Sequence, residues 1–312
     1  MSLYQKHRPK TPADLVGCTA AQDTLAKWED GGVETIPHAI LFAGPSGTGK
    51  TTLGRMVARM VACSKLDYTE LDSADFRGID TIRDLRQKVG YAPRKGPCRV
   101  WLLDECHQLS KDAQNALLKV LEDTPKHVYL FLATTEPEKL LTTVRSRCTR
   151  VDTALLTPPE MGRDLLRPVC KAEGVKVPKA VLQRIAQESM GCARMGLVML
   201  ESVIGLPKEK MMAAVVAWES GQADTRKLCR LLLDGKEWKE VSELLGQLKG
   251  TSDPEYTRLG IMGYMTAVML NPRGGSGNRA RYVAECFSES FFYSKFNGLV
   301  ACCWDAVHVG DD

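Results

Sequence analysis

One stretch of this chain, residues 44 to 51, limits its possible folds more than any other. It reads Gly44-Pro45-Ser46-Gly47-Thr48-Gly49-Lys50-Thr51 and fits the pattern G-x-x-x-x-G-K-[ST] at every fixed position. An apolar run at 39–43 precedes it, and residues 52–61 follow with apolar side chains at helical spacing. This strand–loop–helix order predicts a phosphate-binding loop at the end of a strand in a parallel α/β sheet.

The residue types of this loop suit a nucleoside triphosphate. Glycines let backbone N–H groups turn toward phosphate oxygens, and the start of the following helix adds a partial positive charge. We expect Lys50 to reach the β- and γ-phosphates and the Thr51 hydroxyl to ligate Mg²⁺. The alternative is a glycine-rich turn that fits by chance, which the flanking strand and helix disfavour. The expected nucleotide-binding residues are Gly44, Pro45, Ser46, Gly47, Thr48, Gly49, Lys50, Thr51 and Thr52.

The sequence changes character about halfway along the chain. The first half alternates short apolar strands with helical patterns, which is typical of a parallel α/β sheet. After the turn at 157–159 the pattern is almost entirely helical. We expect an α/β domain over 1–153 and two all-α domains over 154–216 and 217–312, the last with a flexible loop at 271–278. Strands are expected at 39–43, 68–71, 100–104 and 129–134, and the clearest helix at 112–122.

Composition excludes several classes of protein. The chain has 312 residues and a formal net charge of +4, which is too mild to indicate nucleic-acid binding by itself. It has no apolar run long enough to span a membrane, and residues 1–10 lack the apolar core of a secretory signal. Its 11 cysteines are scattered without a Cys-x-x-Cys pair. We therefore expect reduced thiols in a cytoplasmic protein, without membrane attachment or structural zinc.

A second candidate site lies at the end of the apolar run 99–103, where Asp104 and Glu105 stand side by side. We expect Asp104 to bind Mg²⁺ and Glu105 to orient and polarise the attacking water. Residues 104–107 also resemble the D-E-x-H box of superfamily-two helicases. Those enzymes need a second α/β domain downstream, where this chain is helical, so we expect His107 to be structural.

Two further positions each allow two interpretations. Thr135 ends the apolar run 129–133 and could lie near the γ-phosphate, but a hydroxyl that caps the strand explains it nearly as well. Arg147 belongs to the basic turn 145–148, which could be an exposed charged segment. The same turn could instead hold an arginine finger that enters a neighbouring subunit and neutralises charge on the γ-phosphoryl group.

Taken together, these motifs resemble the clamp-loader ATPases of the AAA+ superfamily, which include the small subunits of replication factor C, the bacterial tau/gamma subunit and the loader ATPase of large tailed phages. The resemblance covers about residues 1–200. Its most diagnostic element is the triplet Ser146-Arg147-Cys148. The matching segments, in order, are 4–10, 14–17, 44–51, 72–80, 104–105, 134–137, 146–148 and 191–194.

The resemblance implies a role for individual positions. The segment that covers the adenine matches Arg8, Pro9 and Val16, and the sensor 1 residue matches Thr135. The finger that acts on the adjacent subunit matches Arg147, and the sensor 2 residue, which reads the γ-phosphate and closes the lid, matches Arg194. The cofactors implied are ATP and Mg²⁺. The region 154–216 would then be the lid and 217–312 a collar through which five subunits assemble.

The resemblance also implies partners. An ATP-driven loader opens a sliding clamp and places it on primer–template DNA during replication, without polymerase activity of its own. The stretch 77–99 is rich in basic residues, and in related loaders it begins with a helix that follows the DNA backbone. The alternative is an ordinary solvated helix face. The expected DNA contacts are Arg77, Arg83, Arg86 and Lys88.

Two departures and two alternatives complete the sequence-based picture. The bacterial subunit carries a four-cysteine zinc module before the acidic strand, but only Cys63 and Cys98 occur there. The polymerase-binding tail of the bacterial tau form is also not expected. One alternative function is a non-hydrolysing scaffold subunit of the same loader. The other is a different AAA+ DNA motor, of the initiator or branch-migration type.

Overall fold

The computed structural model describes residues 2–73, 78–250, 254–270, 276–289, 291 and 294–308. The chain divides into two compact units, Met1–Gly205 and Leu206–Asp312. Each unit has its own hydrophobic core.

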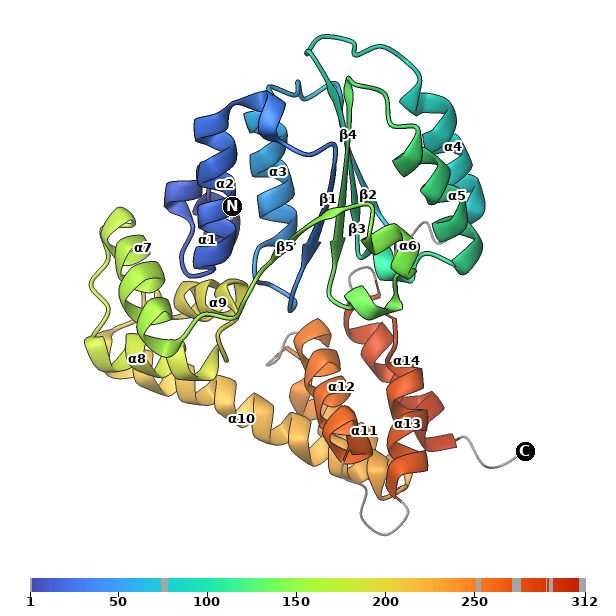
Figure 1. Cartoon of the computed structure of the whole chain (residues 1–312). Coiled ribbons are helices and arrows are strands. Elements are labelled where there is room, and N and C mark those ends of the chain that lie inside the picture. The colour runs from blue at the N-terminus through green and yellow to red at the C-terminus, as the bar shows by residue number, and fades with distance from the viewer. Residues whose placement is uncertain are drawn as a thin grey trace. The chain divides into compact units, whose positions relative to one another are not determined.

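A five-stranded sheet lies at the centre of the first unit (Figure 1). Its order is β2-β3-β4-β1-β5, and every pairing is parallel. Because Leu132 of β4 lies opposite both Leu41 of β1 and Leu103 of β3, the carboxyl ends of these three strands meet at one edge. The strands are β1 Ala39–Ala43, β2 Tyr68–Asp72, β3 Arg99–Asp104, β4 Val128–Thr134 and β5 Thr149–Asp152.

Helices cover both faces of this sheet, as Figure 1 shows. On one face α2 (Thr19–Gly31) and α3 (Lys50–Met60) bury Leu25 and Val57 against the strands. On the other face α4 (Ile79–Val89) and α5 (Lys111–Glu122) bury Leu85 and Leu117. The sheet is therefore buried on both sides, which explains the continuous apolar runs of β1, β3 and β4.

The first unit also contains a helical part beyond the sheet. It comprises the π-helical turn Glu160–Leu166, α7 (Arg167–Ala172), α8 (Lys179–Glu188) and α9 (Ala193–Val203). The short helix α1 (Leu3–Lys6) is tied to it, since Lys6 Nζ lies 2.8 Å from Glu173 Oε2. Another short helix, α6 (Thr142–Arg145), lies between β4 and β5.

The second unit consists of helices. They are α10 (Lys208–Leu233), α11 (Trp238–Leu248), α12 (Pro254–Leu270), α13 (Ser276–Cys286) and α14 (Lys295–His308). All five contribute to one hydrophobic core, which includes Leu228, Leu244, Ile261, Val283 and Cys303. Among the described residues, no helix combines the length and apolarity needed to cross a membrane.

Three details differ from the sequence-based expectations. Strand β5 was not expected, because only Val151 of its residues is buried and so it carries no apolar run. The boundary expected between 216 and 217 falls inside α10, whereas the two units meet at Gly205 and Leu206. The loop expected at 271–278 ends earlier, since α13 begins at Ser276; residues 271–275 lie outside the described part.

Candidate nucleotide-binding and hydrolysis site

The phosphate loop connects β1 to α3 and has no room for side chains at two of its glycines. A Cβ on Gly44 would lie 2.3 Å from the Thr153 carbonyl oxygen, and one on Gly47 would lie 2.4 Å from Cys192 Sγ. Gly47 and Gly49 also have φ angles of 72° and 102°, which L side chains disfavour. Gly49 is the N-cap of α3, so the loop ends where the free N–H groups of a helix start begin.

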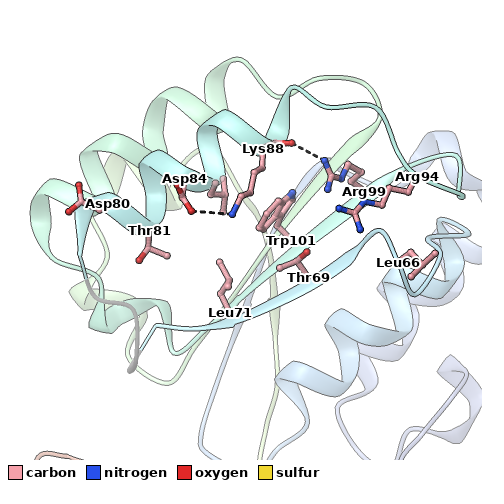
Figure 2. A pocket seen from close by; sticks show the side chains of 11 residues that line it. Leu66, Thr69, Leu71, Asp80, Thr81, Asp84, Lys88, Arg94, Arg99 and Trp101 are labelled. Atoms are coloured by element: carbon pink, nitrogen blue, oxygen red, sulfur yellow. Dashed lines mark hydrogen bonds and ion pairs between the residues drawn. The ribbon is translucent and has the colours of Figure 1, made fainter.

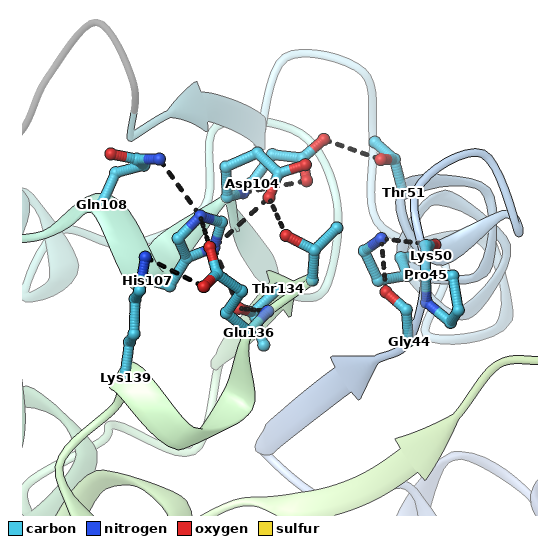
Figure 3. Close-up of polar contacts among 12 residues, drawn as sticks. Gly44, Pro45, Lys50, Thr51, Asp104, His107, Gln108, Thr134, Glu136 and Lys139 are labelled. Atoms are coloured by element: carbon cyan, nitrogen blue, oxygen red, sulfur yellow. Dashed lines mark hydrogen bonds and ion pairs between the residues drawn. The ribbon is translucent and has the colours of Figure 1, made fainter. Parts of the chain in front are cut away.

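Lys50 begins α3 and is 5% exposed. Its Nζ donates to the carbonyl oxygens of Gly44 at 2.9 Å and Pro45 at 3.0 Å (Figure 3). Burial lowers the pKa of Lys50, and the nearby carboxylates of Glu105 and Asp104 oppose this effect. The ammonium group is thus held inside the loop, where a phosphate would lie.

The two oxygens that we expect to ligate Mg²⁺ belong to Thr51 and Asp104 and lie close together. The Thr51 hydroxyl donates to Asp104 Oδ2 at 2.7 Å, so the start of α3 and the end of β3 are in contact. Mg²⁺ usually takes one or two protein oxygens together with phosphates and water, and this hydroxyl–carboxylate pair fits that pattern. Within the described residues no cluster of three metal-binding side chains occurs.

Glu105 directly follows β3 in a left-handed backbone conformation, with φ 47° and ψ 41°. This conformation is uncommon outside glycine and asparagine. The Thr135 hydroxyl, from the end of β4, donates to Glu105 Oε2 at 3.2 Å. Burial raises the pKa of Glu105, while the charge of Lys50 opposes the rise. The structure therefore brings Lys50, Glu105 and Thr135 together at the carboxyl edge of the sheet.

His107 takes part in the same group of contacts, which the sequence did not indicate. The ring is buried, and its Nδ1 lies near both Glu105 and Thr134, the last residue of β4. His107 meets Thr134 only because β3 pairs with β4, and the sequence contains no local signal for this contact between the two side chains.

Arg194, near the start of α9, lies next to the phosphate loop. Its Cβ is 3.5 Å from the position that a Cβ on Gly47 would take, and its guanidinium lies 5.9 Å from the centre of the Tyr4 ring. This location suits a residue that reports on the γ-phosphate. The N-terminal segment with Arg8, Pro9 and Val16 contacts α3, since Arg59 donates to the Lys10 carbonyl at 3.0 Å. The adenine contact stays a prediction.

Arg147 follows α6, and its described partners belong to neither the phosphate loop nor the acidic pair. Its guanidinium donates to Glu122 Oε1 at 2.5 Å and to the Thr143 carbonyl oxygen at 3.0 Å. These contacts hold the side chain at the end of α5. They are compatible with an arginine that acts outside its own subunit.

The expected DNA contacts do not share one surface. Arg83 and Arg86 are exposed on α4, and Arg83 pairs with Asp80 at 2.9 Å. Lys88 instead lines a pocket between α4 and the edge strand β2 and lies 3.1 Å from Asp84 (Figure 2). Arg77 is outside the described residues.

The chain matches two protein-family models and is similar to several known proteins. A family model described as "DNA polymerase III, delta subunit" matches residues 67–156, and one described as "RCF1/5-like, AAA+ ATPase lid domain" matches residues 164–204. The chain is 37% identical over 227 residues to DNA polymerase III subunit gamma/tau of Mycobacterium tuberculosis. It is 34% identical over 274 residues to DNA polymerase III subunit tau of Bacillus subtilis.

The chain is thus similar to DNA polymerase III gamma/tau subunits. These matches confirm the resemblance stated from the motifs. The chain covers only part of these relatives: the alignments span 65% and 79% of this chain but 39% and 47% of theirs.

Solved structures show the same fold at low sequence identity. The Thermotoga maritima RuvB Holliday junction branch migration motor has a TM-score of 0.59 and 20% identity, and the match covers 73% of this chain and 79% of that chain. At this identity the likeness concerns the fold alone. Together with the lid match, it confirms the expected AAA+ architecture of a parallel sheet followed by helical regions.

Proposed function

We propose that this chain is an ATPase subunit of a sliding-clamp loader in DNA replication. It uses ATP binding and hydrolysis to open a processivity clamp and place it on primer–template DNA. The observation that carries the proposal is the convergence of Lys50, Thr51, Asp104, Glu105 and Thr135 at one sheet edge. The likeness to gamma/tau subunits supports the loader assignment.

Each side chain has a role in this proposal. Lys50 contacts the β- and γ-phosphates, and Thr51 with Asp104 holds Mg²⁺, which neutralises phosphate charge when bound. Glu105 orients a water molecule for in-line attack and accepts its proton. Thr135 fixes the Glu105 carboxylate from the neighbouring strand. Sites of this kind work mainly by positioning, so small displacements lower the rate.

Two arginines connect this site with its surroundings. Arg194 reads the γ-phosphate within the subunit and links it to the lid. Arg147 acts in trans on the site of the adjacent subunit, where a finger of this kind contributes roughly 10³–10⁵ in rate. Arg8, Pro9 and Val16 cover the adenine.

The proposed organisation has three parts: a nucleotide-binding domain over 1–153, a lid over 154–216 and a collar over 217–312. The collar joins the subunits of a pentamer, and the complex works in the cytoplasm without structural zinc. Arg83 and Arg86 contact the DNA backbone from their shared exposed face. Arg77 and Lys88 are further candidates, although Lys88 already pairs with Asp84.

The complete site favours this proposal over its alternatives. A scaffold subunit that does not hydrolyse ATP has no need for Lys50, Thr51, Asp104 and Glu105 together. A branch-migration motor shares the fold at 20% identity, whereas the higher identities belong to gamma/tau subunits.

The Glu105→Gln variant tests the proposal. We expect it to bind ATP normally and to lose turnover by about 10²-fold or more, because the general base is removed while the side-chain volume is kept. Turnover is measured with a candidate clamp and primed DNA, and nucleotide binding is measured separately. Glu29→Gln, an exposed change on α2, is the matched control. Wild-type turnover in Glu105→Gln would contradict the assignment of the base.

The trans role of Arg147 has its own test. Mixtures of wild-type chains with Arg147→Ala chains should lose DNA-stimulated ATPase faster than in proportion to the mutant fraction, because each mutant subunit disables a neighbouring site. If the ATPase rate falls strictly in proportion to the mutant fraction, Arg147 acts only within its own subunit.

A further inference from the structure

His107 is a buried side chain beside the proposed base, and the role given to it above is only structural. It lies in the short 3₁₀ turn Cys106–Gln108 that follows the acidic pair. Figure 3 shows its ring with polar groups at both of its nitrogens. A buried imidazole with contacts on both edges fixes the groups that it touches.

The Nδ1 edge faces the base. Nδ1 lies 3.1 Å from Thr134 Oγ1 and 3.4 Å from Glu105 Oε2. The Thr135 hydroxyl donates to the same oxygen at 3.2 Å. Both contacts to the carboxylate therefore use Oε2, and neither uses Oε1, which can take the proton of the attacking water.

The Nε2 edge of the ring faces Gln108 and Glu136. The amide nitrogen of Gln108, which can only donate, lies 3.1 Å from Nε2. A neutral ring that accepts from this amide at Nε2 carries its hydrogen on Nδ1, on the side of Thr134 and Glu105, and this is the tautomer that the inference below assigns. Burial lowers the pKa of His107, against the effect of Glu136, and this favours the neutral ring.

The contacts continue from the ring to the next segment of the chain. Thr134 Oγ1 accepts the backbone N–H of Glu136 at 3.0 Å, and Glu136 Oε1 lies 3.4 Å from Nε2. Glu136 also pairs with Lys139 at 2.9 Å. The ring thus connects Glu105 to the segment that leads from β4 toward α6 and Arg147.

We propose that His107 is a positioning residue for Glu105: its Nδ1–H edge, together with Thr135, holds carboxylate oxygen Oε2 so that Oε1 faces the attacking water. This inference rests on the proposed ATPase function and deepens it. It assigns to His107 an effect on turnover that acts through Glu105 and leaves nucleotide binding unchanged.

Three substitutions separate the two edges of the ring. His107→Ala should lower kcat of the full-length chain by about tenfold, with the Kd for ATP changed less than about twofold, because only the positioning of the base is lost. His107→Asn keeps an amide donor near the position of Nδ1 and should restore kcat to within about threefold. His107→Gln places its amide near Nε2 instead and should stay as slow as His107→Ala. A wild-type kcat in His107→Ala, or equal rescue by both amides, would overturn the proposal.

A double-mutant comparison shows whether the effect passes through Glu105. Single-turnover ATP hydrolysis is measured for Glu105→Gln with and without His107→Ala, and we expect the two rates to agree within about twofold. A further tenfold fall in the double variant would refute a role through the base. His127→Ala, at the opposite end of β4, is the matched histidine control. Thermal melts of every variant separate loss of positioning from loss of folding.

The outcomes also distinguish this inference from the function on which it rests. If Glu105→Gln hydrolyses ATP at the wild-type rate, the proposed base is wrong. If Glu105→Gln is inactive while His107→Ala is fully active, the proposed function stands and only the role of His107 is lost.

Discussion

At the scale of single residues, the phosphate loop and the helical part of the first unit are in direct contact. Gly47 lies against Cys192, the N-cap residue of α9, and Arg194 follows two positions later. Any side chain at position 47 must therefore displace either the loop or α9. This contact gives the loop a second constraint in addition to its phosphate chemistry.

The Gly47→Ala variant should bind ATP about tenfold more weakly. Its Cβ would meet Cys192 Sγ at 2.4 Å, and a φ of 72° costs alanine about 1–2 kcal/mol. Adding Cys192→Ala removes the sulfur and should restore part of the affinity, while the backbone strain remains. Titration with a fluorescent nucleotide measures both variants. Equal affinities for the single and double variants would show that the sulfur contact has no effect.

Asp67 links stability to pH. Its carboxylate accepts the backbone N–H groups of Arg94, Lys95 and Gly96 as well as the Ser64 hydroxyl. Burial by itself raises the pKa of Asp67, but these hydrogen bonds hold it well below its usual range. A carboxyl group with a depressed pKa stabilises the fold above its unfolded pKa of about 4, and this stabilisation is lost as the pH falls.

We therefore expect Asp67→Asn to melt at a lower temperature than the wild type at pH 7. The difference should narrow as the pH falls below about 4, because the unfolded chain then takes up a proton that the folded carboxylate does not, and it vanishes once the folded carboxyl group is protonated too. Thermal melts across this pH range provide the measurement, with the exposed Asp23→Asn on α2 as the control. A difference that does not depend on pH would rule out the ionised carboxylate as its cause.

The sequence predicted those site residues that belong to local motifs. Lys50, Thr51, Asp104 and Glu105 follow from fixed spacings after apolar runs, and the structure brings them together. The contact between His107 and Thr134 could not be predicted, because it depends on the register between β3 and β4, which are separated in sequence by α5.

At the scale of elements, α5 joins the two strands that carry Glu105 and Thr135. Its N-cap Ser110 accepts the Ala113 N–H at 3.2 Å. Its amphipathic pattern made it the clearest helix in the sequence, and the structure places it at Lys111–Glu122. Strand β5 lacked such a pattern, since one buried residue in four gives no periodic signal.

Removal of the α5 cap should destabilise the chain. Ser110→Ala leaves an N–H of the first turn without its acceptor, and we expect a loss of about 1 kcal/mol. Ser110→Asp supplies another acceptor and should keep most of the stability. Urea unfolding curves compare the two variants with the wild type. The cap would have no energetic role if the alanine variant unfolded at the wild-type midpoint.

At the scale of the whole molecule, the two units bury separate cores. The motifs of the nucleotide site, including Arg194, lie in Met1–Gly205. The sequence predicted that the C-terminal region is helical, but it did not predict that the first helix of Leu206–Asp312 begins at Lys208. The Pro207 that precedes α10 marks the helix start more directly than the apolar pattern used to place it.

A fragment of residues 1–205 should fold and bind ATP with a Kd within about threefold of the full chain, because its cores are complete. It should fail to oligomerise because it lacks the proposed collar, residues 217–312, and its ATPase should then no longer respond to DNA. Mass measurement in solution and nucleotide titration check these two outcomes. If the fragment assembles like the full chain, the assembly surface lies in the first unit.

The left-handed backbone of Glu105 has a consequence for how this protein can change. A glutamate at φ 47° is held in a conformation that costs about 1–2 kcal/mol, and asparagine adopts it more readily. Glu105→Asn should therefore raise the melting temperature while turnover falls. The backbone at position 105 therefore opposes thermal stability to the proposed turnover, and a change that improves one should impair the other.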